Sequence, residues 1–190
     1  MTASARDETT IMPVTPFHYP ITYLIHKTGK NFFSLPALTV GGILPDLECP
    51  FIFLLSGGEI DRLILHSFLG AIIIGLPLSM AILLIYQRWL PPIFHVDKDS
   101  MKEETSLSWK LIASALIGLE SHVFIDLLHH PYNPLLYPFT TSSFNYLVLF
   151  GDVSTASMVI YILIGASFIL LLIRELRFGR NGFWNRLLVK

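Results

Sequence analysis

Two long apolar stretches constrain the fold of this chain more than any other feature. Residues 68–86, FLGAIIIGLPLSMAILLIY, and residues 153–173, VSTASMVIYILIGASFILLLI, contain no charged side chain. A helix needs about 20 apolar residues to cross the hydrocarbon core of a bilayer, and each stretch is about that long. Only 14% of the 190 residues are charged, whereas about a quarter are charged in soluble domains. Both observations predict a multi-pass protein integral to the cell membrane.

The apolar pattern predicts an all-α, polytopic membrane helical bundle with about four transmembrane spans. We expect the spans at residues 33–55, 62–88, 107–129 and 153–173. The segment 17–28 is too short to cross and is expected to form an N-terminal half-membrane or interfacial helix. The two prolines of PDLECP should break the first span. Irregular backbone at membrane depth is tolerated only where it is buried in protein or lines a cavity.

Basic residues predict the orientation of the bundle. Lysine and arginine follow the last span and populate the polar loop expected at 88–106, but the connections 56–61 and 130–152 contain neither. The positive-inside rule therefore predicts that both termini are cytoplasmic. A flexible N-terminal extension, a single integral membrane domain and a basic cytoplasmic tail are then expected at residues 1–11, 12–176 and 177–190.

Charge and cysteine content narrow the expected partners and cofactors. The net charge of −1 gives no indication of a nucleic-acid partner, so membrane lipid and other membrane proteins are the expected partners. Cys49 is the only cysteine, which excludes an intramolecular disulfide and a metal site built from several cysteines.

The stretch GLESHVFIDLLHH, residues 118–130, concentrates ionisable groups in the third predicted span. On a helical wheel Asp126 lies about 40° from His122, and His129 lies about 20° to the other side. His130 lies about 80° from His122 on the same face, whereas Glu120 is about 160° away. Two imidazoles and a carboxylate on one face suit zinc, with manganese as an alternative divalent ion.

Further ionisable groups are expected near this face. His66 lies toward the outer end of the second span, and Asp46 and Glu48 lie at the break in the first; the place of His18 depends on how segment 17–28 docks. Each has an ordinary structural interpretation, such as a hydrogen-bonded histidine for His66 or a helix N-cap for Asp46. Because ionisable groups inside spans usually face the protein interior and serve function, their coincidence favours a metal or proton-handling site.

Four motifs occur in an order typical of one family. They are MPVTPFH (12–18), ILPDLECP (43–50), DRLILHS (61–67) and SHVFIDLLHHPYNPLLYP (121–138). This set resembles the YdjM-like membrane-bound proteins, which are assigned as metal-dependent hydrolases, and their archaeal relatives that begin M-P-x-T-x-x-H. The resemblance covers most of the chain from Met12 to about Pro138. It implies a metal site formed by His18, Asp46, His66, His122, Asp126 and His130.

The chain departs from the pattern of that family in two motifs. Bacterial members carry D-x-D-H, where this chain has Asp46, Glu48 and then Cys49. They also carry H-R-G-x-T-H-S, where this chain has Asp61 in place of the first histidine. Asp61 can still ligate a metal or serve catalysis. His130 fits the motif better, whereas His129 has the better helical angle, so both stay open as ligands.

The sequence supports three hypotheses of function. The first is a metal-dependent hydrolase acting on a lipid or lipid-linked phosphate ester, with one or two divalent ions that activate water and Glu48 accepting the proton. The second is a non-catalytic accessory subunit of a larger membrane complex, with structural buried charges and a docking loop at 131–150. The third, a metal or proton conduit, is less favoured because no span carries a regular chain of ionisable groups from one side to the other.

Overall fold

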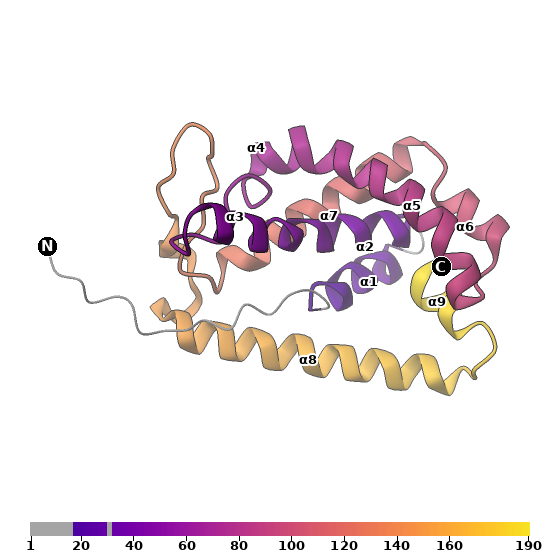
Figure 1. Cartoon of the computed structure of the whole chain (residues 1–190). Helices are drawn as coiled ribbons and strands as arrows, with labels where there is room; N and C mark the ends of the chain where they lie inside the picture. Colours follow the sequence, from indigo (N-terminus) through magenta and orange to yellow (C-terminus); the bar gives the residue numbers. More distant parts are fainter. Residues whose placement is uncertain (1–16, 30–31) are drawn as a thin grey trace, which may run out of the picture.

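The computed structural model describes residues 17–29 and 32–190, and its secondary structure within these ranges is entirely helical (Figure 1). The predicted all-α class is therefore confirmed for the described part of the chain. The expected flexible extension at 1–11 and most of the MPVTPFH motif lie outside the described residues.

Helices α2 (Leu35–Ile43) and α7 (Trp109–Leu127) form the centre of the bundle. Each begins after a serine whose hydroxyl accepts a hydrogen bond from a first-turn backbone N–H, the usual role of an N-cap. A Cβ atom on Gly118 would lie 2.4 Å from the carbonyl oxygen of Leu38, and one on Gly41 would lie 2.3 Å from that of Ala115. Glycine thus allows the two backbones to touch, as small residues do between membrane helices.

The first span is interrupted where the sequence predicts a break. Helix α2 is followed by a 3-10 turn, η1 (Leu44–Leu47), and then by α3 (Cys49–Leu55). Pro45 and Pro50 stand at the starts of η1 and α3, where their missing N–H groups cost least. The interruption places Asp46 and Glu48 on irregular backbone, and both side chains are buried.

The second span begins later and ends later than predicted. It consists of α4 (Phe68–Gly70), a π-helical turn η2 (Ala71–Gly75) and α5 (Leu76–Phe94). Pro77 stands in the first turn of α5, directly after the π-helical turn. Residues 62–67, assigned to the span from sequence, form a non-helical loop with Asp61 instead.

The polar loop expected at 88–106 is largely helical. Helix α5 continues into it, and α6 (Lys98–Glu104) fills much of the rest. The extension of α5 is stabilised because Leu90 and Phe94 pack on a buried cluster of Val96, Met101 and Val189. Asp97 caps α6 by accepting a hydrogen bond from the backbone N–H of Ser100. Hydrogen bonds from the side chain and the backbone of Ser100 lower the pKa of Asp97.

Within the described residues, three helical stretches are long and apolar enough to cross a membrane: Leu35–Leu55, Phe68–Phe94 and Val153–Arg177. The third predicted span, now α7, is not among them because its 19 residues include Lys110, Glu120 and Asp126. It packs inside the bundle against α2 and α5. A fourth crossing and cytoplasmic termini remain predictions.

Helices α1 (Tyr19–Thr28) and α8 (Val153–Arg177) complete the bundle, with α8 along the lower edge in Figure 1. The short segment predicted as a half-membrane helix is thus a helix of ten residues. The end of the chain folds back as α9 (Phe183–Leu188). Arg186 of α9 donates from Nε to the buried carboxylate of Glu175 at 2.8 Å, and Tyr19 donates to the carbonyl of Leu187.

Candidate metal centre

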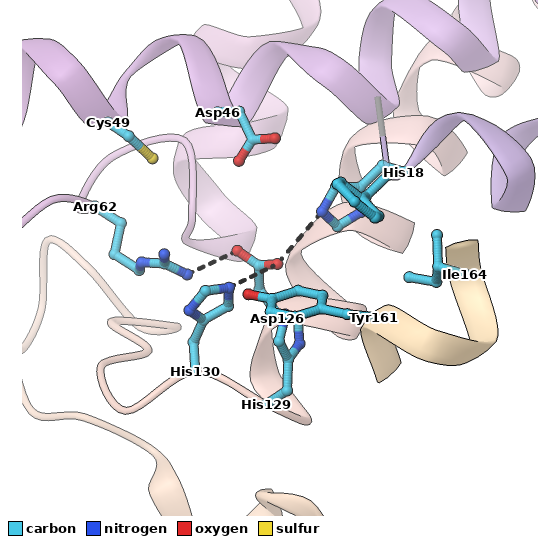
Figure 2. A pocket seen from close by; sticks show the side chains of 10 residues that line it. His18, Asp46, Cys49, Arg62, Asp126, His129, His130, Tyr161 and Ile164 are labelled. Carbon is cyan, nitrogen blue, oxygen red and sulfur yellow. Dashed lines mark hydrogen bonds and ion pairs between the residues drawn. The ribbon is translucent and has the colours of Figure 1, made fainter. Parts of the chain in front are cut away.

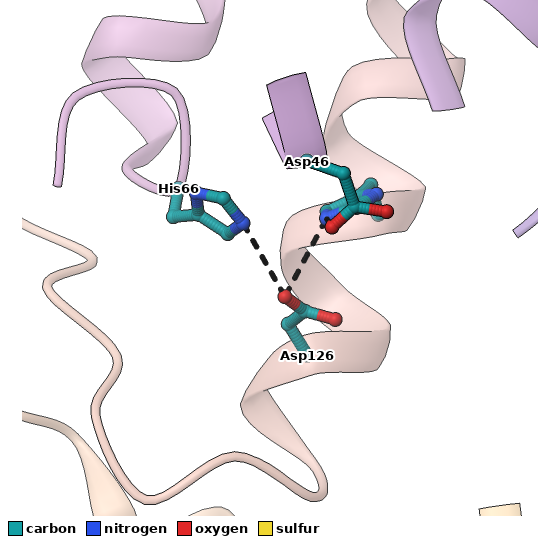
Figure 3. Close-up of side chains that lie close together, drawn as sticks. Asp46, His66 and Asp126 are labelled. Atoms are coloured by element: carbon teal, nitrogen blue, oxygen red, sulfur yellow. Dashed lines mark ion pairs between the residues drawn. The ribbon is translucent and has the colours of Figure 1, made fainter. Parts of the chain in front are cut away.

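Asp126, near the C-terminal end of α7, is the centre of a buried group of histidines. Its Oδ2 atom lies 3.4 Å from Nε2 of His122 and 3.5 Å from Nε2 of His66 (Figure 3). Its Oδ1 atom lies 3.5 Å from Nε2 of His18 and 3.6 Å from Nε2 of His130 (Figure 2). The carboxylate is only 3% exposed. Four imidazoles therefore converge on one carboxylate; they come from the N-terminal end of α1, the loop at 61–67, α7 and the turn after it.

Asp46 completes a compact set of ligand atoms with three of these residues. Its Oδ1 atom lies 3.4 Å from Nε2 of His122. One nitrogen or oxygen atom from each of Asp46, His66, His122 and Asp126 lies within 4.8 Å of every other. A tetrahedral ion with bonds of about 2.0–2.1 Å holds its ligand atoms about 3.3–3.4 Å apart. The spacing of the four side chains fits one such ion.

Hydrogen bonds orient two of the histidines toward this centre. Nδ1 of His122 lies 2.8 Å from the carbonyl oxygen of Gly42. Because a carbonyl only accepts, Nδ1 carries a proton, and Nε2 is the ring atom that faces the carboxylates. Nδ1 of His66 faces Oε1 of Glu48 at 3.3 Å, which fixes its ring in the same way. Neutral imidazoles held by a second hydrogen bond are the usual form of a histidine ligand.

The site leaves two buried polar atoms unsatisfied. Nε2 of His122 and Oδ1 of Asp126 have no hydrogen-bond partner among the described residues. A buried acceptor without a donor costs about 1–3 kcal/mol, and more when it is charged. A cation bound between lone pairs that face one another in a closed site stabilises them electrostatically. The donor set, two carboxylates and two imidazoles, therefore fits a divalent metal ion.

Glu48 is held by the loop at 61–67. Its carboxylate accepts hydrogen bonds from the backbone N–H groups of Leu63 at 2.5 Å and Leu65 at 2.6 Å. With the contact to His66, both of its oxygens are engaged. The geometry favours a role for Glu48 in orienting His66. The role of proton acceptor, which the sequence suggested for Glu48, stays a prediction.

Arg62 is a member of the site that sequence reasoning did not assign. Its guanidinium donates to Oδ2 of Asp126 at 2.8 Å (Figure 2) and forms two bonds of 3.1 Å to the carboxylate of Asp61. Burial lowers the pKa of Arg62, but Asp126 and Asp61 raise it above its ordinary value, so the group is a permanent cation. Asp61 therefore contacts the site only indirectly, through its hydrogen bonds with Arg62. Two signals were available: Arg62 matches the arginine of the H-R-G-x-T-H-S motif, and it directly follows the connection at 56–61, which contains no basic residue.

His130 and His129 occupy different positions beside Asp126. Nε2 of His130 faces Oδ1 of Asp126, and burial holds the pKa of His130 well below its usual value, so its ring is neutral. His129 bonds through Nδ1 to the carbonyl oxygen of Ile125, and its ring lies edge-on to Tyr161. Both can form a ligand group with Asp126. The closer approach to Oδ1 favours His130.

A small cavity lies beside the cluster and can hold a ligand next to its side chains (Figure 2). The cavity has a volume of about 20 Å³, which is enough for an ion or a water molecule. His18, Asp46, Arg62, Asp126 and His130 line it on one side, and Tyr161 and Ile164 of α8 line it on the other. Glu120 is not among the lining residues, as the helical wheel predicts.

Comparison with known proteins identifies the family. A family profile described as the YdjM inner membrane protein matches residues 20–185. No curated protein and no solved structure matches the chain. The chain therefore belongs to the YdjM inner membrane protein family, and it is a membrane protein with a buried histidine–aspartate cluster that can bind a metal ion.

Proposed function

We propose that this protein is a membrane-embedded, metal-dependent hydrolase that cleaves a lipid-linked phosphate ester. The observation that supports the proposal is the buried set of Asp46, His66, His122 and Asp126, whose ligand atoms lie within 4.8 Å of one another and include two atoms without a hydrogen-bond partner among the described residues. Zinc fits this donor set best, with manganese as the alternative. A divalent ion bound there would supply Lewis-acid activation of a water and of a phosphoryl oxygen.

The residues around the cluster would have separate roles in hydrolysis. His66 and His122 would hold the ion, oriented by Glu48 and by the carbonyl of Gly42. In the reaction the water oxygen bonds to phosphorus, the bond to the lipid alcohol breaks, and the alcohol leaves with the proton. Glu48 would act through the position of His66, since its oxygens already accept backbone hydrogen bonds.

Arg62 supports a phosphate ester as the substrate. A guanidinium has five N–H donors in a planar fork that matches phosphoryl oxygens. Three of them are used in the bonds to Asp61 and Asp126. The others can donate to a substrate oxygen in the adjoining cavity, which Arg62 lines. A buried cation beside a metal ion would stabilise the charge that develops on a transferred phosphoryl group.

The seam between α1 and α8 supports a lipid as the group that carries the phosphate. The cavity at the cluster is bounded by Phe17 and Ile164. A second hollow along the same two helices is lined by Pro20, Leu24 and Leu170, among others. Ile164 and Leu170 lie less than two turns apart on α8. An apolar chain in this seam would place its phosphate at the cluster.

Leu170→Trp tests the lipid in this proposal. The indole should fill the seam and lower kcat/KM of zinc- or manganese-loaded protein for a long-chain lipid phosphate by about tenfold, a typical scale for lost apolar contacts. Hydrolysis of a short soluble phosphate ester should stay within about twofold. Ile169→Trp is the matched control, because Ile169 is similarly exposed on α8 but does not line the seam.

Two outcomes would contradict the proposal. Equal losses with both esters in Leu170→Trp would contradict the assignment of the seam to a lipid chain. No hydrolysis of any lipid phosphate by the metal-loaded wild type would contradict the enzymatic function itself.

A non-catalytic accessory subunit is the second candidate. The observation that favours it is the set of exposed aromatic side chains in the loop at 131–150, where Phe139 is 83% exposed and Tyr146 is 76% exposed. Such side chains are typical anchors of protein interfaces. Co-purification of a membrane protein that is lost in Phe139→Ser, from a preparation without bound metal, would support this candidate over the hydrolase.

A further inference from the structure

Resting on the proposed hydrolysis of a lipid-linked phosphate ester, we propose that Tyr161 of α8 contacts the substrate and donates a hydrogen bond to the ester oxygen that leaves with the lipid alcohol. Tyr161 lies outside the four sequence motifs and is not one of the candidate metal ligands. The proposed function requires a metal centre and a bound ester but no donor on the leaving oxygen, so the role of Tyr161 is a separate claim.

The hydroxyl of Tyr161 is buried and has no hydrogen-bond partner among the described residues. The hydroxyl of Ser157, one turn earlier on α8, donates to the carbonyl oxygen of His129 at 2.8 Å and forms no hydrogen bond of normal geometry with Tyr161. Buried hydroxyl groups in folded proteins nearly always have a partner. The phenol of Tyr161 therefore lacks an acceptor that a ligand bound beside it would supply.

Two aromatic contacts hold the ring of Tyr161 at the edge of the cavity. The ring of His129 lies edge-on to it, with centroids 5.4 Å apart and planes at 86°. The ring of Phe17 packs against it with centroids 5.8 Å apart. Figure 2 shows the hydroxyl end of Tyr161 directed toward Asp126 and His130. The phenol is thus oriented with its donor toward the cluster.

Tyr161 lies between the candidate metal centre and the seam of α1 and α8. It lines the cavity together with Ile164, which is one turn further along α8. Leu171, two turns beyond Ile164 on the same face of the helix, lines the hollow assigned above to the lipid chain. An ester with its phosphorus at the cluster and its chain in the seam has its bridging oxygen at this junction, beside Tyr161.

The bridging oxygen is the atom that gains most from a donor. When its bond to phosphorus breaks, negative charge develops on the oxygen of the lipid alcohol. A hydrogen bond to that oxygen is therefore stronger in the transition state than in the bound ester, which accelerates the reaction. Arg62 lines the cavity on the side opposite Tyr161, where its free N–H groups face the other phosphoryl oxygens. The two donors would thus bind different oxygens of one ester.

Tyr161→Phe tests this role with two esters that differ in their leaving group. One is dodecyl phosphate, which releases a poorly stabilised alkoxide; the other is a nitrophenyl phosphate that carries the same dodecyl chain and releases a stable nitrophenolate. In zinc- or manganese-loaded protein, the variant should lower kcat about 100-fold for dodecyl phosphate, as expected for one lost donor on a developing oxyanion, and less than about fivefold for the nitrophenyl ester. Its metal content should equal that of wild type.

Thermal unfolding of the metal-free protein gives a readout that does not depend on activity. Tyr161→Phe removes a buried hydroxyl without a partner, so the variant should unfold at the wild-type temperature or above it. Tyr86→Phe is the matched control, because the hydroxyl of Tyr86 donates to the carbonyl oxygen of Leu188 at 3.1 Å. This control should unfold at a lower temperature than wild type and keep the wild-type kcat for both esters.

The outcomes separate the role of Tyr161 from the proposed function. Equal losses with the two esters, or a wild-type rate with dodecyl phosphate, would overturn the contact with the leaving oxygen and leave the hydrolase intact. A Tyr161→Phe protein that unfolds well below wild type would assign the hydroxyl to the stability of the fold and overturn the contact as well. No hydrolysis of either ester by the metal-loaded wild type would overturn both proposals.

Discussion

Replacing Asp126 with asparagine is expected to lower the metal affinity of the purified protein by more than about 100-fold, beyond the 10- to 100-fold typical of supporting residues around a metal. The amide oxygen of asparagine can still accept the hydrogen bond from Arg62, and Asp61 still compensates the guanidinium. The variant should therefore fold. It lacks the charge that all four surrounding histidines face, so the expected loss is specific to metal binding.

Dialysis against buffered zinc followed by elemental analysis measures this loss. Asp99→Asn is the matched control, because Asp99 is an exposed residue of α6 remote from the site, and its metal content should equal that of wild type. A folded Asp126→Asn protein with wild-type metal content would contradict the assignment of Asp126 as the central ligand.

The second large effect is expected from Gly118→Ala. The added Cβ atom would lie 2.4 Å from the carbonyl oxygen of Leu38 and 2.9 Å from the backbone nitrogen of Gly42, so α2 and α7 must move apart. Overpacking costs about 1–3 kcal/mol, and a clash between two backbones belongs at the upper end of that range. The movement would also weaken the hydrogen bond from His122 to Gly42 and lower metal occupancy.

Thermal unfolding in detergent, monitored by circular dichroism, measures the change in stability. Gly165→Ala is the same substitution within α8, where a Cβ atom would have no other atom within 4 Å. The control should be neutral or stabilised by about 0.5–1 kcal/mol, since alanine is the better helix former. Equal unfolding temperatures for the two variants would contradict the close approach of α2 and α7.

Much of the fold follows from local patterns in the sequence. The uncharged stretches predict α5 and α8, and the prolines of PDLECP predict the interruption between α2 and α3. Element boundaries depend on tertiary packing instead. Helix α5 runs through Pro91 and Pro92 because Leu90 and Phe94 pack on residues from α6 and the chain terminus. That extension depends on tertiary packing against α6 and the chain terminus, which the local pattern does not show, so the sequence indicated a loop.

The site was predictable where helical periodicity or motif order applies. The spacing of His122 and Asp126 places both on one helical face, and the structure brings His66 and Asp46 to that face. The roles of Glu48 and Arg62 depend on the conformation of the loop at 61–67. The sequence of this loop has no helical periodicity from which its conformation could be predicted. Its conformation directs two backbone N–H groups at Glu48 and buries Arg62 against Asp126.

The metal content of the wild-type protein tests the central claim most directly. Elemental analysis of protein purified without chelators, after exhaustive dialysis, should find at least one zinc or manganese ion per chain. X-ray absorption should then show only nitrogen and oxygen ligands at about 2.0–2.2 Å, since the four ligands that we propose are histidines and aspartates. A folded, monodisperse preparation with less than about a tenth of an ion per chain, unable to take up zinc or manganese, would contradict the account.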